Sequence, residues 1–219
     1  MISQWDLQKS ILFYFAKKTV MEEKIKSHLK KDTVMATIVD SVALPDIDAH
    51  GDVYLGLVRS IVFQQLSGKA AQTIYDRFLQ LFEDGYPHPD QLIQFNMEAL
   101  RAVGLSRQKA SYVQNVANFF LNQHQSPVSW EDWEDEKILK HLTQIKGVGT
   151  WTVQMILMFT LGRPDVLPLG DLGIQQAMSK AYNIEGPPKV LKSQMEKIAT
   201  NWQPYRSFAS RLLWRWLDS

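Results

Sequence analysis

Apolar residues recur at helical spacing along most of the chain. Leu7, Ile11, Leu12 and Phe15 share one face of a helix, and similar i, i+3, i+4 repeats return throughout the sequence. The alternation of apolar and polar residues that is typical of strands is nearly absent, and its best stretch, residues 166–169, is interrupted by proline. The pattern therefore predicts an all-α protein, with helices over residues 53–65, 70–82, 92–103, 109–121 and 138–145.

The breaks in this pattern indicate how the helices are grouped. No Gly/Ser linker divides the chain, but a Pro/Gly-rich crossing at residues 162–173 separates a central block of helices from the C-terminal ones. We expect one all-α unit over residues 1–219, built as a two-lobed helical bundle. A lobe of residues 51–172, which holds a helical hairpin at about 138–160, is expected to pack against a lobe formed by 1–50 and 173–219.

Composition excludes several classes of site. The 219 residues include no cysteine, which removes disulfides, thiolate metal sites, cysteine nucleophiles and cysteine-bound iron–sulfur clusters. The five histidines are scattered without metal-ligand spacing. No apolar run approaches the roughly 18 residues that a membrane span needs, and the polar start lacks a signal-peptide core. We therefore expect a cytoplasmic protein, associated with the nucleoid if prokaryotic, that has no membrane partner.

The charge balance limits how the chain could bind nucleic acid. Its formal net charge is +1, whereas nucleic-acid-binding domains usually carry a basic excess. Any contact with DNA must then come from a local patch or from backbone N–H groups.

The stretch Leu142-Thr-Gln-Ile-Lys-Gly-Val-Gly-Thr-Trp-Thr152 is the most informative one. Gly147 and Gly149 permit a tight turn between a helix that ends near Ile145 and a helix that begins near Thr150. The free N–H groups at such a helix start form an anion site, although the same glycines also suit a plain corner of a bundle. A dinucleotide fingerprint is disfavoured, because Thr152 stands at the third glycine position and no strand precedes it. The phosphate-binding residues that we expect are Lys146, Gly147, Val148, Gly149, Thr150 and Thr152.

One carboxylate stands out in the segment that follows. Asp171 lies in the Pro/Gly-rich loop of Leu167-Pro-Leu-Gly-Asp171, just before another predicted helix. An aspartate in that position is commonly an N-cap, and it can also be a catalytic group. The residues alone leave both interpretations open.

The hairpin, the Gly/Pro loop and the aspartate together resemble the HhH-GPD superfamily of base-excision DNA glycosylases, which have a helix-hairpin-helix motif. Three further stretches are similar to its alkylpurine branch, 3-methyladenine DNA glycosylase II. They are Ile61–Ser67 with Ala70-Ala71, Gly104–Ala110, and Trp202–Ala209 leading to Trp214. The resemblance runs from about residue 53 to 216, leaves residues 1–30 unplaced, and has no room for the N-terminal β-domain of some members.

This resemblance implies a function. Asp171 becomes the catalytic residue of an enzyme that everts alkylated purines of the 3-methyladenine and 7-methylguanine class from damaged double-stranded DNA and hydrolyses their N-glycosidic bond. Bifunctional members have a nucleophilic lysine where this chain has Trp151, so we expect no lyase step. Two alternatives are another HhH-GPD glycosylase, for oxidised or deaminated bases, and a non-catalytic helix-hairpin-helix DNA-binding module; a third is a helical protein-interaction scaffold.

The resemblance also implies roles for other side chains, each of which has a plainer structural alternative. Trp151, Met155 and Trp214 would line the base pocket, or lie in the core; a Met155 where alkyladenine enzymes often have tyrosine leaves the substrate range open. Gln65 and Leu66 would form the wedge that fills the DNA stack, or a simple turn. Arg107 and Lys109 would contact phosphate or be solvated, and Arg206 would pair with a carboxylate. We expect a monomer that requires no cofactor, with a structural Na⁺ or K⁺ at the hairpin on the backbone carbonyls of Thr143, Ile145 and Val148.

Overall fold

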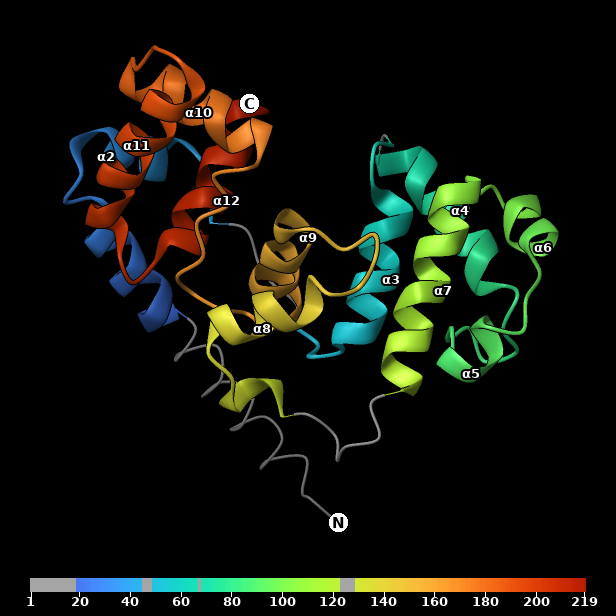
Figure 1. Ribbon diagram of the computed structural model, residues 1–219. Helices are drawn as coiled ribbons and strands as arrows, with labels where there is room; N and C mark the ends of the chain where they lie inside the picture. The colour runs from blue at the N-terminus through green and yellow to red at the C-terminus, as the bar shows by residue number, and fades with distance from the viewer. Residues whose placement is uncertain (1–18, 45–48, 67, 123–128) are drawn as a thin grey trace, which may run out of the picture. The chain divides into compact units, whose positions relative to one another are not determined.

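The computed structural model describes residues 19–44, 49–66, 68–122 and 129–219, and these form helices and loops without a strand (Figure 1). They divide into two compact units, which we call the central unit, residues 47–163, and the terminal unit, residues 1–46 with 164–219. The predicted helical repeat at residues 7–15 lies outside the described residues. No helix in the described ranges is long and apolar enough to span a bilayer.

The central unit is organised around helix α3 (Val53–Phe63), which packs on α4 (Gly68–Leu79), α7 (Arg107–Leu121), α9 (Thr150–Met155) and the short π-helix η2 (Ile156–Thr160). Apolar side chains on α3, such as Leu57, Val58 and Ile61, are fully buried. Gly56 permits the close approach of η2, because a Cβ there would lie 2.6 Å from Thr160 Oγ1. The remaining helices of this unit are α5 (Pro89–Leu92), α6 (Met97–Ala102), η1 (Trp130–Asp132) and α8 (Asp135–Leu142).

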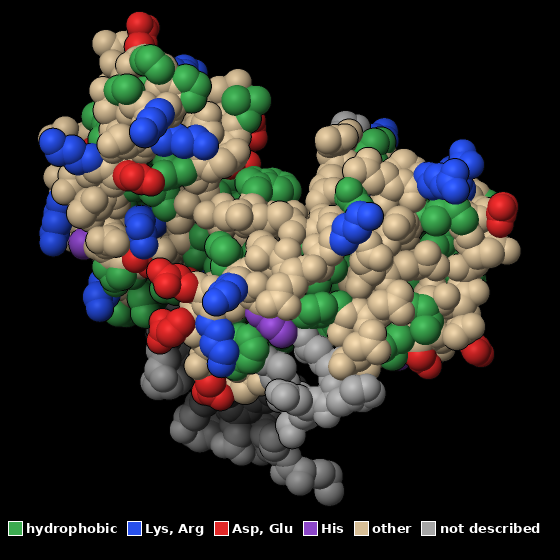
Figure 2. Space-filling model, in the orientation of Figure 1, with side chains coloured by type: hydrophobic (Ala, Val, Ile, Leu, Met, Phe, Trp, Pro, Cys, Tyr) green, Lys and Arg blue, Asp and Glu red, His purple; other side chains and the backbone are tan. Residues whose placement is uncertain are grey.

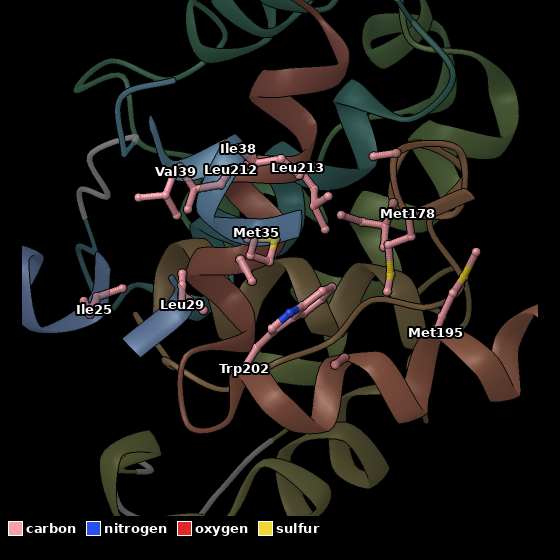
Figure 3. Close-up of a cluster of buried hydrophobic side chains, with 14 residues drawn as sticks. Ile25, Leu29, Met35, Ile38, Val39, Met178, Met195, Trp202, Leu212 and Leu213 are labelled. Carbon is pink, nitrogen blue, oxygen red and sulfur yellow. The ribbon is translucent and has the colours of Figure 1, made fainter. Parts of the chain in front are cut away.

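The terminal unit joins helices from both ends of the chain. A helix over 19–29 and α2 (Thr33–Ser41) pack with α10 (Leu172–Tyr182), α11 (Pro188–Ala199), η3 (Thr200–Trp202) and α12 (Arg206–Leu217). Figure 3 shows the fully buried Trp202 among Met35, Met178 and Met195.

Hydrogen bonds to Asp32 connect the helices around this core. Asp32 Oδ1 caps α2 by accepting hydrogen bonds from the N–H groups of Val34 and Met35. Asp32 Oδ2 accepts hydrogen bonds from the Tyr182 hydroxyl (2.8 Å) and Trp202 Nε1 (3.2 Å). One carboxylate therefore ties α2 to α10 and to η3.

The boundary of the units differs from the prediction. The chain passes to the terminal unit after residue 163 rather than 172, and the central unit begins at 47 rather than 51. The reason is that the loop after residue 163 is bonded to the start of α12. Ser207 N donates to Pro164 O (3.0 Å), Val166 N donates to Ser207 Oγ (2.9 Å), and Arg206 pairs with Asp165. Asp171 consequently belongs to the terminal unit.

A second expectation was wrong in detail. The predicted helix over 92–103 does not form as one element, because α5 ends at Leu92 and α6 begins only at Met97. Asn96 interrupts it, because its side chain caps α6 by accepting a hydrogen bond from Ala99 N (2.8 Å). The other helices predicted among the described residues are present, with ends shifted by a few residues.

Candidate functional site

The predicted hairpin is present in the central unit. Helix α8 ends at Leu142, and a tight turn follows in which Val148 N donates to Ile145 O at 3.0 Å. Gly147 has a φ of +104°, a conformation that side chains disfavour, and Gly149 is the N-cap of α9. Gly147 therefore has the role in the turn that the sequence predicted. The turn does not require a glycine at position 149, because the φ of Gly149 is −99° and a Cβ there would meet no atom within 4 Å.

Helix α7 supports this turn through two residues that the sequence analysis missed. The ring of Tyr112 lies against Gly147 so closely that a Cβ there would be 2.3 Å from Tyr112 Cγ. Asn115 Nδ2 donates to Lys146 O at 3.1 Å. The sequence feature that could have identified both residues is their spacing of three, which places them on one face of α7.

The start of α9 has the properties of an anion site. Gly149 has no side chain with which to cap the first N–H groups of the helix. Lys146 and Thr150 are exposed beside it, and Val148 is buried beneath it. The Thr152 side chain is 3% exposed and its hydroxyl accepts from Gln64 Nε2 at 3.4 Å, so a phosphate contact by Thr152 would use its backbone N–H.

The turn that carries the predicted wedge lies at the end of α3. Gln65 has a φ of +56°, which is uncommon for a residue other than glycine, and its side chain is exposed. Leu66 is 39% exposed, a large fraction for leucine. The turn therefore presents one polar and one apolar side chain to solvent.

Asp171 is the N-cap of α10. Its Oδ1 atom accepts hydrogen bonds from Ile174 N (2.9 Å) and from Trp214 Nε1 on α12 (2.8 Å). Gly173 allows this close approach, because a Cβ there would lie 3.1 Å from both Asp171 Oδ1 and the Trp214 indole, a tight contact. The capping role is confirmed, and the indole N–H adds a second donor that fixes the carboxylate in the terminal unit.

The three predicted pocket residues lie in different surroundings. Trp151 is 38% exposed, which makes the core alternative wrong for this residue, and Met155 lies one turn later on α9, partly buried. Trp214 is partly buried and is directed at Asp171 by its N–H group. The structure thus brings Trp214 to Asp171, and places Trp151 and Met155 in the central unit.

The two candidate phosphate contacts on α7 differ. Arg107 is exposed. Lys109 instead donates from Nζ to the backbone carbonyl of Val62 at 2.8 Å, and burial lowers the pKa of its ammonium group. Lys109 is therefore hydrogen-bonded within the central unit, and a phosphate contact by this residue stays a prediction. The ion pair predicted for Arg206 is confirmed, with Nε 2.7 Å from Asp165 Oδ1.

The charged side chains on the visible face do not form a single patch. On the face drawn in Figure 2, Lys and Arg side chains are scattered and acidic side chains lie among them, with no continuous basic surface. Nor does any group of three or more His, Asp or Glu side chains in the described ranges have the arrangement of a metal site. At the hairpin, Ile145 O accepts one hydrogen bond, and a carbonyl oxygen has a second lone pair for a cation.

Comparison with known proteins places this geometry in a family. The family model described as HhH-GPD superfamily base excision DNA repair protein matches residues 58–204. The DNA-3-methyladenine glycosylase 1 of Schizosaccharomyces pombe is 33% identical over 165 residues, which cover 74% of this chain and 71% of that protein.

Solved structures support the same family assignment. The S. pombe 3-methyladenine DNA glycosylase Mag1, in complex with abasic DNA, matches with a TM-score of 0.77 and 30% identity, over 88% of this chain and 95% of that one. A DNA-3-methyladenine glycosidase of Bacillus halodurans matches with a TM-score of 0.74 and 35% identity, over 89% of each chain. This chain belongs to the HhH-GPD superfamily of base excision DNA repair proteins.

Proposed function

We propose that this protein is a monofunctional DNA glycosylase that removes alkylated purines, of the 3-methyladenine and 7-methylguanine class, from double-stranded DNA. Family membership supports glycosidic chemistry, and the names of its relatives support this class of base. The relative solved with abasic DNA supports DNA as the partner. We further propose that the enzyme acts as a monomer.

The arrangement around Asp171 carries the proposal. Two N–H donors hold Oδ1 in a single orientation, which is the property required of a preorganised catalytic carboxylate. Alkylation at N3 or N7 makes the purine cationic, so the base already leaves readily as a neutral molecule. The carboxylate then stabilises the oxocarbenium-like sugar and accepts a proton from the water that adds to C1′.

The other residues would bind and open the DNA. The uncapped N–H groups of α9 and the ammonium group of Lys146 would contact a backbone phosphate. A Na⁺ or K⁺ ion on the carbonyl oxygens of Thr143, Ile145 and Val148 would add positive charge at the same turn. Gln65 and Leu66 would fill the space left by the everted nucleotide. The aromatic side chains of Trp151 and Trp214, with Met155, would favour a cationic base, by about 1–2 kcal/mol for each desolvated cation–π contact.

The test is to incubate the protein with methylated DNA and to identify the released bases. We expect free methylated purine from the wild type, and at least about a hundredfold slower release from Asp171→Asn. Asparagine is as good an N-cap as aspartate, so this variant should keep its melting temperature. Equal release by both proteins would exclude catalysis by Asp171, and no release by the wild type would favour the DNA-binding module.

The lack of a lyase step is tested in the same reaction. The residue at the lysine position of bifunctional enzymes is Trp151, which cannot form a Schiff base. The product strand should therefore stay intact until alkali cleaves its abasic sites. Strand cleavage without alkali would contradict the monofunctional assignment.

A further inference from the structure

Lys109 is unusual for its place in helix α7. Ser106 is the N-cap and accepts a hydrogen bond from Lys109 N at 3.2 Å, so Lys109 occupies the third position of the helix. Positive charge in the first turn of a helix is disfavoured by the helix dipole, and a glutamate or glutamine is preferred there. The residue type is therefore not explained by α7 itself.

The end of helix α3 explains it. The C-cap N–H of Gln64 bonds to the carbonyls of Ser60 and Ile61, and Lys109 Nζ donates to the next carbonyl, that of Val62, at 2.8 Å. A cation at a helix C-terminus interacts favourably with the dipole and binds carbonyls that the helix leaves open. Burial lowers the pKa of this ammonium group, which agrees with its partly buried position.

The wedge turn, residues 64–66, begins directly after this contact. Gln65 has a φ of +56°, and such a conformation persists where the surrounding structure holds it. The turn has two anchors: Lys109 of α7 at Val62, and Thr152 of α9, whose hydroxyl accepts from Gln64 Nε2. The second anchor connects the wedge turn to the first turn of the hairpin's second helix.

We infer that Lys109 is a positioning residue that holds the wedge turn in the conformation that enters the DNA stack, and that it does not bind phosphate. The inference rests on the proposed function, because it assigns Lys109 to wedge insertion during base eversion. Removing the ammonium group should leave the DNA footprint unchanged and should impair insertion.

The experiment compares Lys109→Met with Arg107→Met, an exposed cation two residues away. The probe is a duplex with a tetrahydrofuran abasic analogue next to 2-aminopurine, whose fluorescence changes when a side chain enters the gap. In Lys109→Met we expect this change to shrink at least about threefold, while the slope of log Kd against log salt stays that of the wild type. Each lost phosphate contact would lower the magnitude of that slope by about 0.9, so a reduced slope in Lys109→Met would overturn the inference.

Two further variants separate positioning from general instability. Lys109→Arg keeps a cationic donor and should restore the fluorescence change. Leu66→Ala should reduce the change by itself, and its combination with Lys109→Met should be no worse than Leu66→Ala alone, because both act through one turn. Additive losses, or a fluorescence change in Lys109→Met equal to the wild type, would overturn the inference. Wild-type release of methylated bases, measured in parallel, would in that case leave the proposed function intact.

Discussion

Oδ1 of Asp171 accepts hydrogen bonds from two N–H groups that have different structural roles. The Ile174 N–H belongs to the cap of α10, whereas the Trp214 indole comes from α12, 43 residues away in sequence. The cap holds the helix start, so the indole adds a contact that orients the carboxylate without being needed for the helix.

Trp214→Phe should therefore reduce base release by about tenfold to a hundredfold, which corresponds to the 1.5–3 kcal/mol typical of a hydrogen bond to a charged group. The phenyl ring keeps most of the packing, so the melting temperature should fall only slightly. Single-turnover release of methylated purine measures the effect. Trp216→Phe, two residues further on, is the matched control because its ring contacts Lys180 rather than Asp171. Equal losses in both variants would show that ring size, not the N–H group, matters.

Residue-scale chemistry was only partly predictable. Asp171 could be found because a carboxylate between a Pro/Gly loop and a helix is a local pattern. Its bond to Trp214, and that of Lys109 to Val62, join positions 43 and 47 residues apart, and no local pattern carries that information. Charge alone therefore left Lys109 open between a phosphate contact and a solvated side chain.

At the scale of elements, the hairpin depends on α7 as much as on its own glycines. Tyr112 occupies the space in which a Gly147 side chain would lie, and Asn115 holds the Lys146 carbonyl. The paired glycines predicted the turn, but not the helix that supports it, because α7 lies some thirty residues earlier along the chain.

Gly147→Ala should destabilise the protein by about 2–4 kcal/mol, the combined cost of overpacking against Tyr112 and of a left-handed alanine. It should also weaken binding to abasic DNA, because the turn must move. Gly149→Ala is the matched comparison for stability: its φ is −99° and a Cβ there meets no atom within 4 Å. It should cost less than about 1 kcal/mol, the loss of a favoured N-cap residue. Chemical denaturation would contradict this account if the two alanines were equally destabilising.

Helix order was predictable from periodicity, and helix ends and unit boundaries were less so. Asn96 divides residues 92–103 by a side-chain cap that competes with the helix. The boundary after residue 163 depends on contacts between the loop and Ser207 and Arg206 of α12, more than 40 residues later. These tertiary contacts place Asp171 in the terminal unit. The sequence pattern alone predicted a central lobe that extends to residue 172 and therefore includes Asp171.

At the scale of the whole molecule, stability should depend on pH on both sides of neutrality. On the acid side, burial and then the charge of Lys137 lower the pKa of His141, which lies edge-on to the rings of Phe119 and Trp133. Its unfolded pKa is near 6.5, so between that value and the lower folded one the unfolded chain binds more protons. The free energy of unfolding should therefore decrease as pH falls below about 6.5.

On the alkaline side, buried and partly buried phenols act in the opposite sense. Burial raises the pKa of Tyr54, Tyr86 and Tyr182 above the ordinary 10.0, and hydrogen bonds to Asp52 and Asp32 raise those of Tyr86 and Tyr182 further. Below pH 10 both states hold these protons and the stability is complete; above it the unfolded chain loses them first, so the free energy of unfolding decreases as pH rises. Tyr54 and Tyr86 belong to the central unit and Tyr182 to the terminal unit, so both units should weaken.

Urea denaturation between pH 5 and pH 11 measures how the free energy of unfolding decreases on the acid side and on the alkaline side, which we call the acid and alkaline limbs. One substitution tests each limb. His141→Phe should flatten the acid limb and leave the alkaline limb unchanged. Tyr182→Phe should reduce the slope of the alkaline limb without abolishing it, because Tyr54 and Tyr86 still contribute. It should cost about 1 kcal/mol near neutrality for the hydrogen bond lost to Asp32. Since the two residues lie in different units, the combined variant should show both changes independently. An acid limb that persists in His141→Phe would assign the acid sensitivity to carboxylates instead, and an unaltered alkaline limb in Tyr182→Phe would mean that its hydroxyl ionises equally in both states.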